Sequence, residues 1–219
     1  MFATAAVAIA AVTAASCSDS GDNGPADQLC ENIVTFTGNS DGQAWFEYQT
    51  LDDSPVITLS VRGSLDTHKV SAGTRLLMRY SLPPGVDPAK GGTVERYSLQ
   101  RVLTDTVALG DHAPAANRSL YLTTIRRSGE YLDIRAQMPY APGRAISLTA
   151  DMTSIGADGV AETYITAVNP PADSAYMAAA TASIWLGPLW RHPEVRGIRV
   201  HLSNTNNPYR DCFTFLRKQ

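Results

Sequence analysis

The fold class follows from the stretch Tyr131-Leu132-Asp133-Ile134-Arg135-Ala136-Gln137-Met138. Its apolar residues occupy every second position, so Leu132, Ile134, Ala136 and Met138 share one face. A period of two is that of a β-strand with one buried face. The turn signal Ser128-Gly129 precedes it and separates it from the next strand upstream.

The C-terminal half repeats this pattern around the quoted stretch. Further strands are predicted at residues 120–125, 145–150, 160–168, 178–186, 197–203 and 212–216. The stretch 178–186 is rich in alanine, which favours a helix, but its neighbours are all predicted strands. We therefore predict that this half is a two-sheet antiparallel β-sandwich.

The N-terminal half is also predicted to consist of strands. They fall at residues 33–37, 45–50, 56–61, 74–82 and 94–103, with Gly-, Asp- and Pro-rich turns between them. Five strands at short spacing predict a small Greek-key barrel. Residues 110–117 are turn-rich and lack large apolar side chains, so we place a boundary there, between a domain at 30–110 and a domain at 111–219.

The start of the chain is predicted to be a targeting signal. Residues 2–15 are almost all apolar, but a helix of that length spans only about 20 Å, short of the ~30 Å core of a bilayer. Residues 1–16 are therefore predicted to be a signal peptide. Ala14-Ala15-Ser16-Cys17 resembles a lipobox, which implies acylation of Cys17 and membrane attachment, although Ala14 replaces the usual Leu and no basic residue follows Met1. Plain secretion is the alternative.

The segment after Cys17 indicates where the protein is anchored. Residues 17–29 contain three Asp and little to bury, which predicts a flexible acidic tether. An acidic stretch after the cysteine is similar to the surface-export signal of Bacteroidetes lipoproteins. We expect an outer-membrane lipoprotein of the cell envelope. The acidic run is either a surface-export signal, which would place the protein on the cell surface, or only a solvated linker.

The two remaining cysteines suggest a disulfide. With Cys17 acylated, Cys30 and Cys212 form an even pair in an oxidising compartment. Such a bridge would close a loop of about 180 residues and stabilise the fold by roughly 5 kcal/mol at most. Two buried free thiols are the alternative.

Composition and motifs exclude several function classes. The net charge of −3 gives no electrostatic case for nucleic acid. The two distant cysteines and four scattered histidines lack metal-ligand spacing, so no metal or cofactor is predicted. No catalytic motif is present, and Asp52-Asp53 is read as a solvated turn rather than a carboxylate pair. We assign no catalytic residues.

Binding is a better hypothesis than catalysis. Small barrels hold ligands on a strand face and its flanking loops, often with exposed aromatic side chains. The candidates are Trp45, Tyr48, Trp185 and Trp190, although aromatic residues on strands more often fill cores. The ligand would be a glycan or a protein.

Four features of the sequence occur together. They are the lipobox-like Cys17 with its acidic tether, Leu51-Asp52-Asp53 after an aromatic strand, the segment 70–81 with its Gly73-Thr74-Arg75, and the segment 97–109. In these features the chain resembles the NigD-like lipoproteins of Bacteroidetes. In the last segment Asp105 stands where a Lys is common. The resemblance implies an OB-like N-terminal barrel followed by a C-terminal β-sandwich, with no established catalytic residues.

These observations favour a non-enzymatic envelope lipoprotein that binds a partner at the cell surface. An anchored or secreted hydrolase acting on envelope polysaccharide is one alternative. The family name suggests another, a bacteriocin-immunity-type protein that binds a protein partner.

Overall fold

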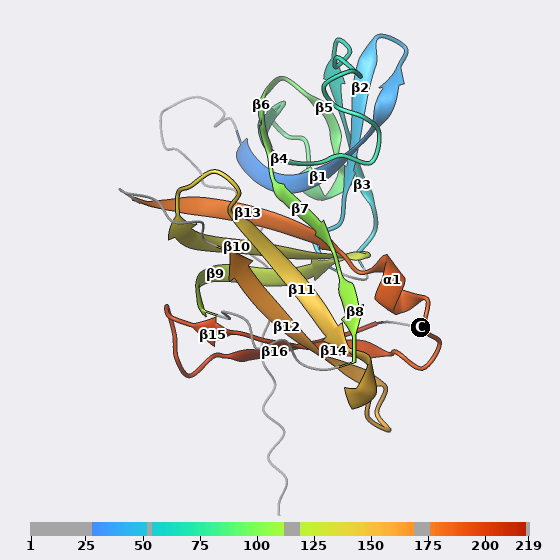
Figure 1. Cartoon of the computed structure of the whole chain (residues 1–219). Coiled ribbons are helices and arrows are strands. Elements are labelled where there is room, and N and C mark those ends of the chain that lie inside the picture. Colours follow the sequence, from blue (N-terminus) through green and yellow to red (C-terminus); the bar gives the residue numbers. More distant parts are fainter. Residues whose placement is uncertain (1–27, 52–53, 112–118, 169–175, 218–219) are drawn as a thin grey trace, which may run out of the picture.

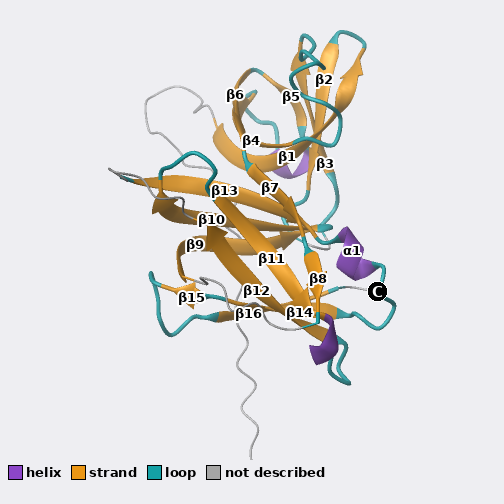
Figure 2. Cartoon of the chain, in the orientation of Figure 1, coloured by secondary structure: helices purple, strands orange, loops and turns teal. Residues whose placement is uncertain are grey.

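The computed structural model describes residues 28–51, 54–111, 119–168 and 176–217, and within them almost all regular structure is β-strand (Figure 2). A curled sheet from the N-terminal half lies against two further sheets from the C-terminal half (Figure 1). The predicted all-β class, an OB-like part followed by a sandwich, is confirmed. Among the described residues, no helix has the length and apolar character needed to cross a membrane.

The N-terminal sheet, which we call the barrel, has the strand order β5-β3-β2-β1-β4-β6. The long strand β1 is central and pairs with both β2 and β4, and a register shift between Phe36 and Gly38 interrupts its pairing with β2. Such irregularities bend a strand and increase its twist. The bounds are β1 Gln28–Ser40, β2 Gln43–Tyr48, β3 Ile57–Arg62, β4 Arg75–Leu82, β5 Gly92–Val94 and β6 Arg96–Arg101, with a 3₁₀ turn at Pro88–Lys90.

The C-terminal half is a sandwich of two mixed sheets. One has the order β15-β9-β10-β13-β7 and the other β16-β14-β12-β11-β8. The hairpin-like pairs are antiparallel as predicted, but β12 pairs with β14 in parallel, as β13 does with β7. The bounds are β9 Ser119–Ser128, β10 Tyr131–Pro139, β11 Ala145–Asp151, β12 Val160–Val168, β13 Met177–Trp185, β14 Gly197–His201, β15 Ser203–Asn204 and β16 Cys212–Leu216, with helix α1 Gly187–Trp190 and a 3₁₀ turn at Met152–Ser154.

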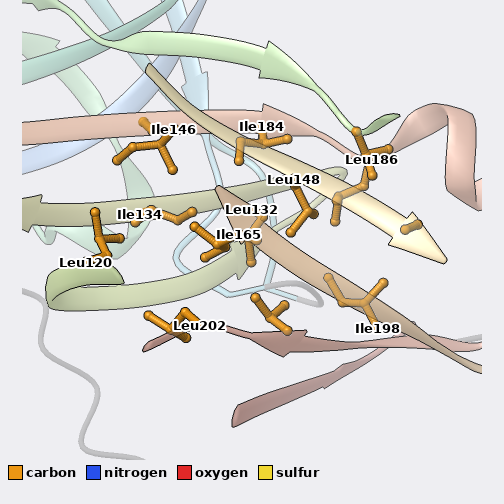
Figure 3. Packing of buried hydrophobic residues seen from close by; sticks show 14 of the residues in the cluster. Leu120, Leu132, Ile134, Ile146, Leu148, Ile165, Ile184, Leu186, Ile198 and Leu202 are labelled. Carbon is orange, nitrogen blue, oxygen red and sulfur yellow. The ribbon is translucent and has the colours of Figure 1, made fainter. Parts of the chain in front are cut away.

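The sandwich core is filled by the apolar positions that the sequence periodicity indicates. Leu132 and Ile134 of β10 point between the sheets and are fully buried, as are Leu148 and Ile165 of the facing sheet (Figure 3). Burying one such side chain is worth about 1.5–3 kcal/mol relative to leaving it exposed. The alternate residues of β10 therefore point away from this core, towards the barrel.

The connection between the halves differs from the prediction. The single strand expected at 94–103 is divided into β5, β6 and β7 (Leu103–Thr106), with breaks at Glu95 and Val102. The strands β7 and β8 (Ala108–Gly110) then pair with β13 and β11, so they belong to the two sandwich sheets. By strand pairing, the change from barrel to sandwich therefore falls at Val102, ahead of the expected boundary at residue 110. Residues 112–118 lie outside the described part.

The structure does not contain the predicted Cys30–Cys212 disulfide. Cys30 is buried in the barrel core on β1, whereas Cys212 is exposed at the start of β16, an edge strand of the sandwich. Figure 1 shows β1 in the barrel and β16 on the side of the sandwich that faces away from the barrel. An even number of cysteines is therefore not sufficient to predict a disulfide in this protein, because the fold places the two thiols in different sheets. Cys17 lies outside the described residues.

We predict that Cys212 reacts with a thiol reagent in the folded protein, whereas Cys30 reacts only after unfolding. Burial raises the pKa of the Cys212 thiol, so its labelling rate should keep rising above the ordinary thiol pKa of about 8.5. Peptide mass spectrometry after native and denaturing labelling measures both sites. A disulfide-linked peptide pair containing Cys30 and Cys212 would contradict the structure.

Candidate functional site

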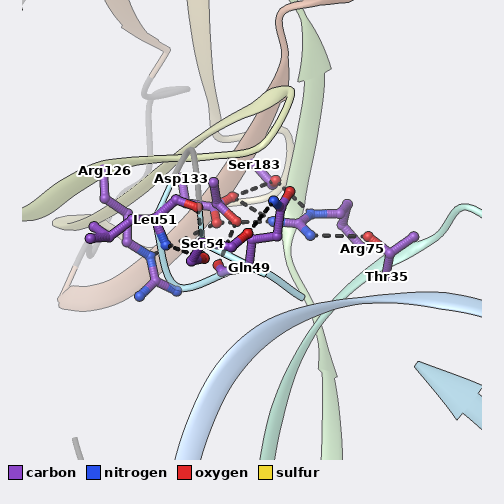
Figure 4. A network of polar contacts seen from close by, with 9 residues as sticks. Thr35, Gln49, Leu51, Ser54, Arg75, Arg126, Asp133 and Ser183 are labelled. Atoms are coloured by element: carbon purple, nitrogen blue, oxygen red, sulfur yellow. Dashed lines mark hydrogen bonds and ion pairs between the residues drawn. The ribbon is translucent and has the colours of Figure 1, made fainter. Parts of the chain in front are cut away.

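The barrel and the sandwich are joined by three buried polar side chains and the half-buried Thr35, which together we call the junction cluster (Figure 4). Arg75 of β4 lies opposite Thr35 of β1, and Asp133 of β10 lies opposite Ser183 of β13. Nη2 of Arg75 donates to both carboxylate oxygens of Asp133 at 2.9 Å. Its Nε donates to Ser183 Oγ at 2.9 Å and its Nη1 to Thr35 Oγ1 at 3.0 Å.

Strand alternation explains why this cluster exists. Because Leu132 and Ile134 point into the sandwich core, Asp133 points out of it, and the barrel covers it. The side chains of Arg75 and Asp133 are only 4% and 2% exposed. Such buried charges cost several kcal/mol each unless paired and hydrogen-bonded. Here Ser183 Oγ also donates to Asp133, at 2.6 Å, and both charges are satisfied.

Two flanking contacts widen the junction. Glu31 of β1 accepts hydrogen bonds from Arg135 of β10 and from Arg79 of β4. Burial raises the pKa of the Glu31 carboxyl, but the hydrogen bonds and charges of the two arginines outweigh burial and hold its pKa below the ordinary value. Arg126 lies beside the cluster, with its Nε 4.0 Å from Asp133, and burial lowers the pKa of its guanidinium.

The loop after β2 is fastened to the sandwich by the turn between β9 and β10. Ser128 Oγ donates to the carbonyl oxygen of Gln49 at 2.9 Å. Gly129 has a φ of +59°, and a Cβ at this position would lie 2.3 Å from Gln49 Oε1. The positive φ therefore favours glycine here, and a larger residue would also push the Gln49 side chain aside.

This fastened loop forms one wall of a cavity at the open end of the barrel, which we call the barrel mouth. Its volume is about 220 Å³, and its walls are mostly apolar. Ile57 begins β3, Pro55 precedes it, and Pro88 and Ala89 face them from the 3₁₀ turn. A concave, mostly apolar site with a few polar groups is typical of a ligand pocket.

The polar groups of the barrel mouth gather around two phenols. The hydroxyl of Tyr48, which lines the mouth, lies 3.2 Å from the hydroxyl of Tyr80. Asn32 Nδ2 donates to the Tyr80 hydroxyl at 3.1 Å. Burial raises the pKa of the Tyr80 phenol, so it stays protonated and remains able to donate. Cys30 also lines the mouth.

A second hollow, the junction groove, lies on the other side of the same loop. It has a volume of about 180 Å³ and is lined by Tyr48, Arg75, Ser128 and Tyr131 among others. The Tyr131 ring lies over the Arg75 guanidinium, with 4.3 Å between the ring centroid and Cζ. Tyr48 therefore contributes to both hollows.

Of the four predicted aromatic candidates, the structure places only Tyr48 in the barrel mouth. Trp45 is half-buried on β2, with its Nε1 3.4 Å from the Ser40 carbonyl oxygen. Trp185 is half-buried and donates to Glu130 at 3.2 Å, beside the junction groove. Trp190 is buried in α1 and packs on the sandwich core. Their roles in binding stay predictions.

The residues that hold this region together, Arg75 and Asp133, were not among the predicted site residues. Asp133 was visible as an acidic residue on the polar face of an alternating strand, and Arg75 as a cation in an apolar strand. Nothing in the sequence pairs them, because they are 58 positions apart and belong to different sheets. Opposite charges on the non-core faces of two predicted strands were the available signal.

The outer face of the sandwich carries a Cys, a His and a Glu near one another. His201 lies opposite Cys212 in the sheet, and its Nε2 is hydrogen-bonded to Glu162. A nucleophilic cysteine needs a base as partner and a lowered pKa. The structure gives no hydrogen bond from Cys212 to His201, and burial raises the Cys212 pKa. This arrangement does not support thiol catalysis.

A third hollow, of about 320 Å³, lies near β15 and is lined by Asn204 and Asp211 among others. Asn204 is committed to the fold, since its Nδ2 donates to the Arg210 carbonyl and its Oδ1 accepts from the Asn206 amide. Within the described ranges, no group of three or more His, Cys, Asp or Glu residues could hold a metal ion.

We predict that Asp133→Asn and Arg75→Met each destabilise the protein by about 3–5 kcal/mol, because each leaves one buried charge without its partner. The double variant Arg75→Met/Asp133→Leu should recover much of that loss, since no charge is then buried. Urea unfolding followed by fluorescence measures the difference.

Lys69→Ala is the control for this comparison, because its ion pair with Asp66 is exposed and should leave the unfolding midpoint almost unchanged. Single junction variants with the wild-type midpoint would show that the cluster contributes nothing to stability.

No family model matches the sequence, and no curated protein matches it significantly. Solved structures do resemble it. A protein of unknown function (DUF1344) from Bacteroides vulgatus matches with a TM-score of 0.60 at 17% identity, over 86% of this chain and 90% of the other. A NigD-like immunity protein from Bacteroides caccae matches with a TM-score of 0.56 at 14% identity, over 84% and 90%.

A candidate lipoprotein from Bacteroides fragilis matches with a TM-score of 0.58 at 9% identity, over 88% of this chain and 99% of the other. At these identities the likeness concerns the fold, and it covers both the barrel and the sandwich. The chain therefore has the fold of the NigD-like immunity protein and its structural relatives from Bacteroides, which confirms the resemblance to that family at the level of fold.

Proposed function

We propose that the protein is a non-enzymatic lipoprotein of the cell envelope that binds an apolar group of a partner in the barrel mouth. The barrel mouth is the observation that carries this proposal, because apolar walls surround a small set of convergent polar groups. The NigD-like immunity protein and the candidate lipoprotein that share the fold support the envelope setting and a protein partner.

The anchor rests on the sequence alone. Ala14-Ala15-Ser16-Cys17 supports acylation of Cys17, and the acidic run after it supports attachment to the outer membrane with the folded part facing outward. Both segments lie outside the described residues. The described part of the chain begins at Gln28, the first residue of β1.

We predict that Cys17→Ala releases the protein from the membrane fraction into the soluble fraction, because no acyl chain can then be attached. Fractionation of cells followed by immunoblotting measures the partition. Ser18→Ala is the matched control and should leave the protein with the membranes. A Cys17→Ala variant that stays with the membranes would contradict lipidation.

The chemistry of the barrel mouth indicates what it accepts. Ile57, Pro55 and Pro88 offer apolar surface, and the hydroxyl of Tyr48 offers one polar contact near them. The volume of about 220 Å³ suits one large side chain of a protein partner. Glu31, Asn32, Thr50 and Ser54 also line the mouth, but most of its wall surface is apolar, which favours an apolar group over a sugar.

We predict that p-cresol, which mimics a tyrosine side chain, binds in the barrel mouth and shifts the NMR signals of Tyr48 and Ile57. Ala89→Trp should abolish these shifts, because Ala89 lies on the exposed rim and a larger side chain there fills the cavity. Ala108→Trp, at an exposed position on β8, is the matched control and should leave binding unchanged.

Methyl β-glucoside serves as the second probe in the same titration. If the glucoside shifts the NMR signals of Tyr48 and Ile57 and p-cresol does not, the ligand of the barrel mouth is a sugar rather than an apolar group. If neither probe shifts the signals of Tyr48 or Ile57, the barrel mouth is not a binding site.

The hydrolase alternative has one observation in its favour. Glu47 and Glu130 both line the junction groove, as a carboxylate pair of a glycosidase would. Both side chains are exposed, however, whereas the acid of such a pair is held in an apolar pocket. Cleavage of envelope polysaccharide that is lost in both Glu47→Gln and Glu130→Gln would establish the hydrolase instead.

A further inference from the structure

One end of the sandwich exposes apolar side chains that the proposed function does not use. We call Tyr140, Val168, Tyr176 and Met177 the sandwich tip. They are 50%, 47%, 65% and 54% exposed, respectively, and come from the ends of β10 and β12 and the start of β13. Scattered exposed apolar residues need no explanation, but a cluster of them at one end of a molecule indicates an interaction site.

The two tyrosines of the sandwich tip are held in place. Their rings are stacked, with 5.3 Å between centroids and 15° between planes. The Tyr140 amide donates to the Tyr176 carbonyl oxygen at 2.9 Å, and Arg144 Cζ lies 5.0 Å from the Tyr140 ring centroid. The sandwich tip thus presents fixed rings next to a cation, and Tyr side chains combine an apolar body with a polar hydroxyl.

The start of the folded chain runs towards the same end. Thr35 of β1 contacts Arg75 in the junction cluster, where Asp133 lies, and Glu31 contacts Arg135 further along β10. β1 therefore runs alongside β10. The direction from Thr35 back to Glu31 is also the direction in which β10 leads to Pro139, the residue before Tyr140. Figure 1 shows the start of β1 and the start of β13 on the same side of the molecule.

The length of chain before β1 limits how far this end can lie from the anchor. Eleven residues separate Cys17 from Gln28, counting Gln28 itself, and such a segment spans at most about 40 Å even when fully extended. Leu29, on the same face of β1 as Glu31, is a further exposed apolar residue near this end. A membrane-held Cys17 therefore keeps Gln28 within about 40 Å of the bilayer, on the side of the molecule where β13 and the sandwich tip begin.

We propose that the sandwich tip rests in the headgroup region of the phospholipid bilayer that holds the acylated Cys17. Tyrosine is enriched at this interface because its ring and hydroxyl match the boundary between lipid and water. Arg144 lies beside these rings, but its Nη1 is buried and its Nη2 donates to the Ala179 carbonyl oxygen at 3.4 Å, so the tyrosine rings and not this cation would meet the headgroups. The inference rests on the proposed lipid anchor.

The test uses the acylated full-length chain in vesicles of phosphatidylethanolamine and phosphatidylglycerol. In a Cys212→Ser background, Met177→Cys carries an environment-sensitive dye, which leaves both tyrosines in place. Tyr209→Cys, at a 95% exposed position between β15 and β16, is the matched control. We expect vesicles to reduce iodide quenching several-fold at position 177 and to leave quenching at position 209 unchanged.

Adding Tyr140→Ser and Tyr176→Ser to the Met177→Cys chain should restore quenching while the protein stays on the vesicles. Equal quenching at positions 177 and 209 in vesicle-bound protein would overturn the inference and leave the anchor intact. Protection of position 177 by purified envelope polysaccharide without vesicles would also overturn it, in favour of a glycan. Failure of the acylated chain to sediment with vesicles would reject the anchor itself.

Discussion

The paired charges of Arg75 and Asp133 are the constraint on which the rest of this structure depends. They face each other from two different sheets, and each would be costly to bury alone. The barrel must therefore sit where its arginine meets the aspartate of β10. That placement brings Gln49 against Ser128, which fixes the loop that walls both the barrel mouth and the junction groove. The same strand β10 thus supplies core residues to the sandwich and a docking residue to the barrel.

Local sequence patterns predicted most of the strands. They did not predict which strands and side chains meet across the fold. The alternation in β10, and even the alanine-rich stretch of β13, predicted strands that the structure contains. The break at Glu95 and the move of β7 and β8 into the sandwich depend on tertiary pairing, which no period in the sequence records. The Cys30–Cys212 disulfide was predicted wrongly for the same reason, since cysteine count carries no information about distance. Tyr48 was identified as a candidate, but its partner Tyr80 is 32 positions away and becomes visible only in the folded barrel.

The proposed activities occupy separate parts of one molecule. The barrel mouth, with its apolar walls and phenol pair, suits a side chain of a partner, while the sandwich tip suits a lipid surface. The anchor and the sandwich tip would together fix how the barrel is presented to the outside of the membrane. The junction cluster would hold the barrel and the sandwich in a fixed relative orientation. If the two parts moved independently, holding the sandwich at a bilayer would not orient the barrel mouth.

The central claim, that the junction cluster makes the barrel and the sandwich one cooperative unit, is tested most directly by native-state hydrogen exchange. We expect the slowest amides of β1 and β4 to exchange with the same opening free energy as those of β10 and β13, because the two parts open together. Barrel amides that exchange through a separate opening of lower free energy, while the sandwich stays closed, would contradict it.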